Sequence, residues 1–327
     1  MKSFLRNDNV LRALILVALI VVFGLLTGGV TYSARGLSNI LLQSSIIGIA
    51  AIGQTFVILT GGIDVSLYGI GVFASVLGAS TLTSRFDLNM VGGDPWPVPV
   101  GIAIILLVGI VMGAVNGLLV ARLRVPALIA TLGMWQIGLG LAQLVGGGYT
   151  ITDLPSSLSM LGQGSIRGVP VPVIEMLLLF ALAHFVLSHT SFGRAIYAVG
   201  GNSASAYLSG IKVRRVQFLV FVISGLMVAL AALSIESRMM SVSIRTLSGL
   251  QLDSIAAVAI GGVSIYGGRG TVLGVLLGTL ILAVIDSGLG AMGASTDVQN
   301  TVKGAVIILA VSIEFFRRRE RPTRITA

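Results

Sequence analysis

The most prominent pattern along the chain is a series of long apolar segments that contain no charged side chain. Six of them cover residues 13–34, 36–63, 65–84, 95–121, 125–152 and 216–235. Each one meets or exceeds the ~20 residues that an α-helix needs to cross ~30 Å of hydrocarbon. The pattern therefore predicts six membrane-spanning helices.

Four further segments are apolar but less regular, and all four contain charged residues. They cover residues 171–188, 251–263, 271–290 and 299–316, and the charged residues in the last three are Asp253, Asp286, Lys303 and Glu314. Together with the first six, they predict about ten transmembrane helices in a single domain over residues 1–327. Composition agrees with an all-α polytopic membrane protein, because 55% of the residues are hydrophobic and only 10% are charged.

The distribution of basic residues predicts the orientation of these helices. If both termini are cytoplasmic, fifteen of the 21 lysines and arginines lie on the cytoplasmic side: Lys2, Arg6, Arg12, Arg122, Arg124, Arg194, Lys212, Arg214, Arg215, Arg269 and five in the basic tail 317–327. Cytoplasmic loops of membrane proteins collect Lys and Arg, so this excess supports the ten-helix count. Orientation and contact with anionic lipids account for the net charge of +9, so no nucleic-acid partner is implied.

The longest cytoplasmic loop, 190–215, is small, polar and rich in glycine. Asn202 is a good N-cap and Gly210 a good C-terminal cap residue, so residues 203–209 are predicted to form a short helix, with Gly200 and Gly201 providing a sharp entry. Such a helix would project from the membrane as a docking element. The alternative is a plain solvated connection, for which far fewer residues suffice.

Four motifs in this chain resemble segments of the permeases of ABC importers of the ribose/xylose/arabinose type, and they occur in the same order. They are GGIDVS at 61–66, VPALIATLGM at 125–134, GRAIYAVGGN followed by SGIKV at 193–213, and GGVSIYGGRGT at 261–271. One departure from the family pattern is the segment 65–69, in which Tyr68 introduces a larger side chain.

The resemblance implies a permease of about ten helices in the bacterial inner membrane that imports a monosaccharide or a similar small polyol. It also implies a second permease copy, a cytoplasmic ABC ATPase and a periplasmic sugar-binding protein. In that family the cytoplasmic loop carries the coupling helix that fits a cleft on the ATPase. The matching positions here are Gly193, Arg194, Gly200, Gly201, Asn202, Ala204, Ser209 and Gly210.

An enzymatic role is not expected from the residues. None of the three lysines follows a glycine, so the chain lacks the Gly-Lys pair of a phosphate-binding loop, and the partner ATPase must use the ATP and Mg. The chain has no cysteine and only two histidines, His184 and His189, which do not share a helix face well. We therefore expect no catalytic site, no metal site and no cofactor bound by this chain.

Uncharged polar residues within the apolar segments are candidates for the solute path, because a neutral polyol must be passed along without tight binding. The candidates are Gln54, Asp64, Asn116, Trp135, Gln136 and Gln143, of which only Asp64 is ionisable. Asp64 follows two glycines that should break a helix, so it either lines the path or caps the next helix. Asn116 lies among Gly109, Gly113 and Gly117, whose spacing is typical of a helix contact face, so it either bonds a neighbouring helix or meets the solute.

Charged residues within the apolar segments allow two further hypotheses. A secondary transporter could couple transport to an ion gradient through Asp64, Asp253 and Asp286, and this is the alternative to an ATP-driven importer. Asp286 and Lys303 are predicted at a similar depth in the last two helices. They either form an ion pair or extend separately to the membrane interface.

Overall fold

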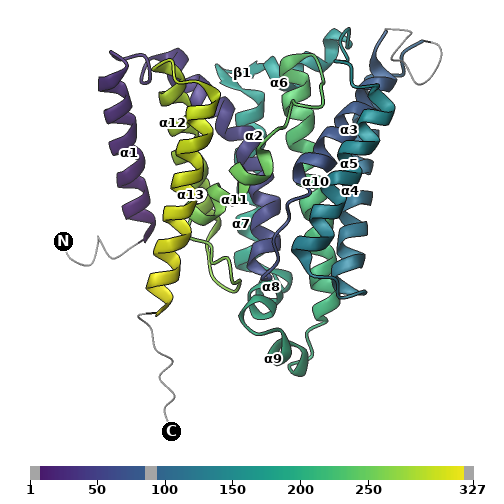
Figure 1. Cartoon of the computed structure of the whole chain (residues 1–327), viewed down its shortest axis with the longest axis vertical. Coiled ribbons are helices and arrows are strands. Elements are labelled where there is room, and N and C mark those ends of the chain that lie inside the picture. Colours follow the sequence, from purple (N-terminus) through teal and green to yellow (C-terminus); the bar gives the residue numbers. More distant parts are fainter. Residues whose placement is uncertain (1–7, 85–93, 320–327) are drawn as a thin grey trace.

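The structure is a computed structural model that describes residues 8–84 and 94–319. The bundle consists of the following helices, most of which run roughly parallel or antiparallel along its height (Figure 1): α1 (Asp8–Leu26), α2 (Ala34–Leu59), α3 (Leu67–Leu82), α4 (Val98–Ala121), α5 (Ala127–Gly146), α7 (Val171–His189), α10 (Val213–Met239), α11 (Leu250–Ile260), α12 (Val272–Ala291) and α13 (Thr296–Arg319). Residues 320–327 of the predicted basic tail, and Lys2 and Arg6, lie outside the described residues.

The shorter elements lie at the two ends of this bundle. At the upper end in Figure 1 are a 3-10 helix (Ser156–Leu158), α6 (Ser159–Gln163) and a hairpin of two short antiparallel strands, β1 (Ser165–Ile166) and β2 (Val169–Pro170). At the lower end, α8 (Ser191–Gly201) and α9 (Ser203–Leu208) protrude below the other helices. We refer to these two helices as the α8–α9 projection.

Seven helices in the described part of the chain are long and apolar enough to cross a membrane. They are α1, α2, α4, α5, α7, α10 and α12. The apolar helices α3 and α11 are shorter, with 16 and 11 residues. The protein is thus a multi-pass, mostly helical membrane protein, as the apolar pattern predicts. The number of membrane crossings, ten, stays a prediction.

The centre of the bundle consists of α2 and α10, whose small residues allow close approach of their neighbours. Along α4, Gly109, Gly113 and Gly117 lie against the backbone of α10, next to the carbonyl groups of Gly225, Phe221 and Phe218 respectively. The spacing predicted a helix contact face here, and this prediction is confirmed. Close backbone contact is a common means of helix association in membranes, where lipid is as apolar as the side chains.

This contact predicts a strong effect of side-chain size at Gly113. We expect Gly113→Val to lower the detergent melting temperature, because overpacking a tight contact costs about 1–3 kcal/mol. The same change at Gly304 in α13, where an added Cβ has open space around it, is the matched control. Equal melting temperatures for the two variants would contradict the α4–α10 contact.

An ion cluster fixes α13 to its neighbours. Lys303 Nζ lies 2.9 Å from Asp286 Oδ2 of α12 and 3.1 Å from Asp253 Oδ2 of α11. The hypothesis of an Asp286–Lys303 pair is therefore confirmed, and separate extension of the two side chains to the interface is wrong. The sequence did not indicate Asp253 as the third member, because α11 reaches Lys303 only through the tertiary packing of α11 on α13.

Candidate functional site

The α8–α9 projection is built from local capping interactions. Thr190 Oγ1 accepts a hydrogen bond from the Gly193 N–H (3.1 Å) at the start of α8, and Asn202 Oδ1 accepts one from the Ser205 N–H (2.9 Å) at the start of α9. Beyond α9, Gly210 has a φ of +83°, which a residue without a Cβ adopts freely. The predicted helix with its Asn202 and Gly210 caps is thus confirmed.

The predicted entry to this helix is wrong. Gly200 and Gly201 are the last two residues of α8, and neither has a positive φ. The chain instead turns at Asn202, whose φ of −160° and ψ of 104° are extended. Residues 191–201 form a helix, even though they are rich in glycine, because α8 packs on the membrane helices.

Three segments that are distant in sequence meet where α8 packs against the bundle. A Cβ at Gly200 would collide with the Leu59 carbonyl oxygen and the Gly268 amide nitrogen, and these two groups form a backbone hydrogen bond of 2.9 Å. Leu59 is the last residue of α2, and Gly268 lies in the loop between α11 and α12. We call this contact of Leu59, Gly200 and Gly268 the glycine junction.

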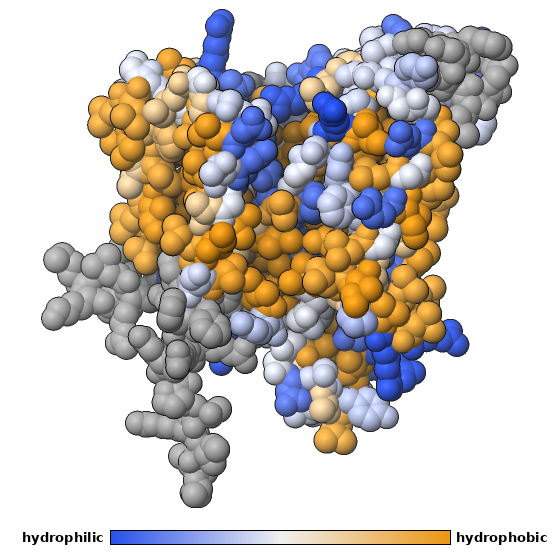
Figure 2. Space-filling view, viewed as in Figure 1, coloured by the Kyte–Doolittle hydropathy of each residue, from blue (hydrophilic) through white to orange (hydrophobic). Residues whose placement is uncertain are grey.

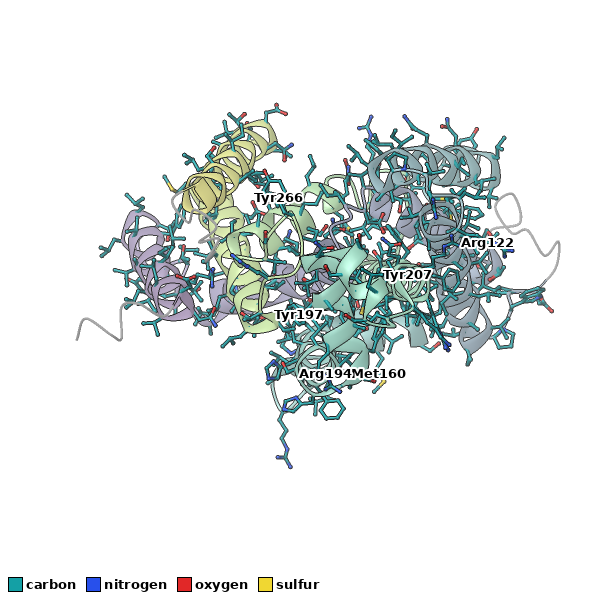
Figure 3. All side chains as sticks on the ribbon, turned by 90° about the horizontal axis from the view of Figure 1, so that it is seen from below. Arg122, Met160, Arg194, Tyr197, Tyr207 and Tyr266 are labelled. Atoms are coloured by element: carbon teal, nitrogen blue, oxygen red, sulfur yellow. The ribbon has the colours of Figure 1, made fainter. Side chains whose placement is uncertain are left out.

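Tyr197 adds a side-chain bond next to the glycine junction. Its hydroxyl donates to the Gly270 carbonyl oxygen at 3.0 Å, and Figure 3 shows Tyr197 from below, on α8. Burial raises the pKa of the Tyr197 hydroxyl above its ordinary value of 10.0, so the hydroxyl keeps its proton and remains a donor at neutral pH. The α8–α9 projection is therefore attached to the loop before α12 by the Tyr197 hydrogen bond and by the close backbone contact at Gly200.

The predicted coupling residues divide into two groups in the structure. Gly193 is buried and Gly200 half-buried, so both serve the packing of α8, whereas the exposed ones are Arg194, Gly201, Asn202, Ala204, Ser209 and Gly210. The sequence reasoning missed Tyr207 and Leu208 in α9, which are 71% and 85% exposed. Figure 2 shows an apolar tip at the bottom of the projection. An adjacent apolar pair in an otherwise polar loop helix was the available signal for this tip.

The motif at 125–134 also joins this region. Thr131 Oγ1 of α5 accepts a hydrogen bond from the Val65 N–H (3.2 Å) and lies 3.3 Å from the Ile63 carbonyl oxygen, to which it can donate. The non-helical residues 60–66 between α2 and α3 are thus held by α5 on one side, and they start at the glycine junction on the other. All four sequence motifs meet around this one break between α2 and α3.

At the upper end of the break, Asp64 is the centre of a buried hydrogen-bond cluster. Its Oδ1 accepts from the Ser66 N–H (2.9 Å) and from the Ser66 hydroxyl, and its Oδ2 accepts from the Ser224 hydroxyl of α10 (2.8 Å). Asn116 Nδ2 of α4 donates to Ser66 Oγ (2.8 Å). The Gln54 amide of α2 faces the Asp64 backbone. With the amide nitrogen toward the Asp64 carbonyl oxygen, the nitrogen donates to that oxygen (3.0 Å) and the amide oxygen accepts from the Asp64 N–H (3.3 Å).

The Asp64 cluster is a structural connection between helices in this conformation. Gln54, Asp64 and Asn116 are at most 1% exposed, so they do not face an open channel. The carboxylate of Asp64 bonds Ser66, which precedes the first residue of α3, and not the free N–H groups of the first helical turn. Asp64 therefore forms a turn before α3 and holds it to α10, while a role in the solute path stays a prediction.

The remaining candidates lie on α5. Gln136 and Gln143 are exposed on one face of the helix, and Trp135 is half-buried with its Nε1 atom buried and without a hydrogen-bond partner among the described residues. Gly133 and Gly140 share this face, and an added Cβ at either would meet nothing within 4 Å. The structure thus separates the six predicted path residues into a buried cluster and an exposed polar face of α5.

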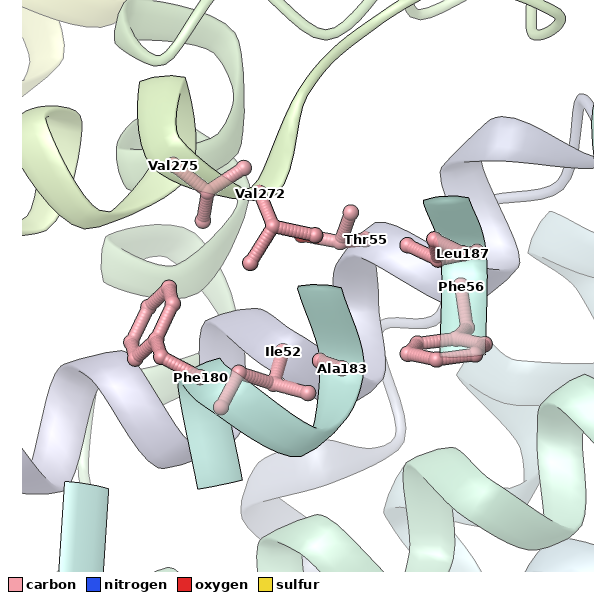
Figure 4. Close-up of a pocket in the computed structure, with 8 residues that line it drawn as sticks. All are labelled: Ile52, Thr55, Phe56, Phe180, Ala183, Leu187, Val272 and Val275. Carbon is pink, nitrogen blue, oxygen red and sulfur yellow. The ribbon is translucent and has the colours of Figure 1, made fainter. Parts of the chain in front are cut away.

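An apolar crevice elsewhere offers no polar site. It lies between α2, α7 and α12 (Figure 4) and is lined by Ile52, Thr55, Phe56, Phe180, Ala183, Leu187, Val272 and Val275. The one polar side chain, Thr55, donates its hydroxyl to the Ala51 carbonyl oxygen at 2.6 Å. A polyol would therefore find no unpartnered polar group there.

Comparisons with known proteins found a matching family model and several similar transport proteins. The family model described as the permease component of the branched-chain amino acid transport system matches residues 36–311. The chain is 40% identical to the ribose import permease protein of Bacillus subtilis (84% of this chain, 83% of that protein) and 38% identical to the fructose import permease protein of Rhizobium meliloti (94% and 85%). It is 33% identical to the xylose transport system permease protein of Escherichia coli K12 (93% and 91%). No solved structure matches the chain.

Proposed function

Because the chain belongs to the family of permease components of branched-chain amino acid transport systems, we propose that it is the membrane permease of an ATP-driven importer for a monosaccharide or a similar small polyol. The observation that carries the proposal is the glycine junction. It connects the α8–α9 projection, with its exposed apolar tip, directly to the break between α2 and α3. A movement of the projection is thereby transmitted to the centre of the membrane helices.

The choice of a sugar over an amino acid rests on two points. The similar proteins quoted above are named for ribose, fructose and xylose. In addition, the exposed polar side chains on α5 are the amides of Gln136 and Gln143, which suit the hydroxyl groups of a neutral solute. A zwitterionic amino acid would require charged partners, and this face of α5 has none.

The partners of the importer follow from the same surfaces. The tip with Tyr207 and Leu208 docks on a cytoplasmic ABC ATPase, which binds ATP and Mg, while this chain binds no cofactor. The face of α5 with Gln136 and Gln143 meets a second permease copy across the solute path, since two amides exposed to lipid are costly. A periplasmic sugar-binding protein docks at the opposite end, on the segment that includes the β1–β2 hairpin.

The membrane topology fits this arrangement. The protein crosses a bacterial inner membrane ten times. The shorter helices α3 and α11 begin inside the membrane, after non-helical segments. Both termini are cytoplasmic, because α1 begins and α13 ends on the side of the α8–α9 projection (Figure 1). The loops on that side carry most of the arginines, in agreement with the positive-inside rule.

Ion-coupled secondary transport is the second candidate, and the structure offers it little support. Its three proposed coupling sites are all occupied by internal partners. Asp253 and Asp286 pair with Lys303, and Asp64 accepts hydrogen bonds from Ser66 and Ser224.

Reconstitution in liposomes tests the two candidates against each other. We expect concentrative uptake of a labelled pentose or hexose only when the permease, the ATPase, the binding protein and ATP are all present. Labelled leucine serves as the control solute, because the family description refers to branched-chain amino acids. Uptake by the permease alone under a proton or sodium gradient would sink the proposal, and uptake of leucine but no sugar would refute the substrate class.

A further inference from the structure

The connection between α10 and α11 enters the membrane from its outer side. Near the outer end, Val242 forms an isolated antiparallel bridge with Ile151. Farther along, Leu247 lies next to Gly71 of α3, and the other neighbours of Gly71 are Val228 and Ala232 of α10. These two residues precede Met239, the last residue of α10, by eleven and seven positions. At 1.5 Å per residue, Leu247 therefore lies roughly 10–16 Å below the outer end of α10.

This re-entrant segment, residues 241–249, has irregular backbone held by local bonds. The Thr246 and Ser248 N–H groups donate to the Ser243 and Arg245 carbonyl oxygens, both at 3.0 Å, and Thr246 Oγ1 accepts from the Ser243 N–H (2.8 Å). One side of the segment is buried through Val242 and Leu247, at 1% and 3% exposure. The segment is thus folded onto the bundle along one side.

The other side of the segment is polar and open. Arg245 and Ser248 are exposed, and Ser243 and Thr246 are half-buried. Figure 2 shows hydrophilic residues that interrupt the apolar surface in the upper middle of this face, where Figure 1 draws the connection to α11. Irregular backbone at membrane depth occurs only where it is buried in protein or lines a water-filled cavity, never against lipid. The open side therefore faces water or a partner protein, and not lipid.

Tyr68 connects this segment to the polar face of α5. Its hydroxyl donates to the Ile244 carbonyl oxygen at 2.6 Å, and its ring centroid lies 6.3 Å from that of Trp135. Trp135 precedes the exposed Gln136, and its buried Nε1 donor has no partner among the described residues. An aromatic pair with a free donor thus lies between two polar surfaces that come from distant parts of the chain.

From these contacts we propose that the re-entrant segment, together with Tyr68 and Trp135, forms an outer solute-binding wall for a neutral polyhydroxylated solute. The ring face of Trp135 binds the C–H groups of the solute, and the exposed side chains of Gln136 and Ser248 bond its hydroxyls. Tyr68 is a positioning residue, because its bond to Ile244 sets the distance between the segment and α5. The solute class rests on the proposed function, whereas the water-lined wall does not.

Single-cysteine labelling tests the wall directly, because the chain has no cysteine of its own. Ser248→Cys and Gln136→Cys, in liposomes with the ATPase and the binding protein, are treated with a membrane-impermeant thiosulfonate. The control is Leu178→Cys, since Leu178 is 66% exposed on the apolar surface of α7. We expect both wall variants to react at least about tenfold faster than the control, as water access requires. Reaction no faster than at position 178 would overturn the wall.

Protection and kinetics test the solute. The transported sugar is expected to slow labelling of Ser248→Cys at least about twofold, and Tyr68→Phe to raise the KM for uptake about fivefold with little change in the maximum rate, since one hydrogen bond is lost. Tyr32→Phe, at an exposed tyrosine outside both surfaces, should leave both constants unchanged. If sugar uptake is normal but labelling is unprotected, or Tyr68→Phe lowers only the maximum rate, the binding role is refuted. Absence of ATP-driven sugar uptake in the unmodified complex refutes the proposed function instead.

Discussion

Replacement of Gly200 by Val is expected to lower ATP-driven uptake at least about tenfold while the ATPase remains bound. The new Cβ would collide with the Leu59 carbonyl and the Gly268 amide, so α8 must move away from the break between α2 and α3. An overpacked contact costs about 1–3 kcal/mol, and 1.4 kcal/mol corresponds to a factor of ten. The tip of α9 is not altered, so hydrolysis should persist without transport. Uptake and pull-down of the ATPase measure the two effects.

Gly201 provides the matched control for this experiment. It is the next residue of the same helix, and an added Cβ there meets nothing within 4 Å. Gly201→Val should therefore transport within about twofold of the unmodified protein, as expected for a surface substitution. Leu208→Asp, at the 85% exposed tip, should instead abolish ATPase binding. Equal uptake by the Gly200 and Gly201 variants would show that the glycine junction does not transmit the motion.

Loss of the Lys303 side chain should strongly destabilise the protein. Lys303→Met leaves Asp253 and Asp286 close together without a cation, and breaking a buried ion pair costs about 3–5 kcal/mol. We expect a clear fall in the detergent melting temperature. Asp286→Asn in the same chain should recover part of the loss, because one of the two uncompensated charges is removed. Addition of Asp253→Asn should recover more.

Lys212 is the control for the loss of a lysine. It is exposed just before α10 and forms no ion pair with any of the described residues, so Lys212→Met should leave the melting temperature nearly unchanged. Strict additivity of the Asp286→Asn and Lys303→Met effects would contradict the cluster. It would also remove the interaction that attaches α13 to α11 and α12.

Local signals in the sequence predicted the elements that depend on few neighbouring residues. The caps of α9 were predictable, because Asn202 and Gly210 act on backbone groups within a few positions of themselves. The helix α8 was not, since Gly200 and Gly201 indicate a turn by their intrinsic preference, and only contact with Leu59 and Gly268 makes a helix favourable there. Tertiary packing therefore overrode the local preference at this point.

The buried connections show the same division. The sequence indicated that Asp64 is unusual, because it is a carboxylate between two apolar segments, but its partner Ser224 lies 160 positions away. Likewise, the depths of Asp286 and Lys303 could be compared by counting along two successive helices, whereas Asp253 lies 50 positions from Lys303 on a helix that is not next to α13 in the sequence.

The sequence by itself determined that this is a multi-pass membrane protein with a capped helix in its longest polar loop. The physical reason is that hydrocarbon thickness demands long uncharged runs, and caps use local hydrogen bonds. Only the tertiary structure decided that four distant motifs meet at one break, that residues 241–249 fold back onto α3, and that α5 carries an open polar face. These features depend on which backbones approach closely, and in a chain with 43 glycines close approach is possible at many places that the sequence alone does not distinguish.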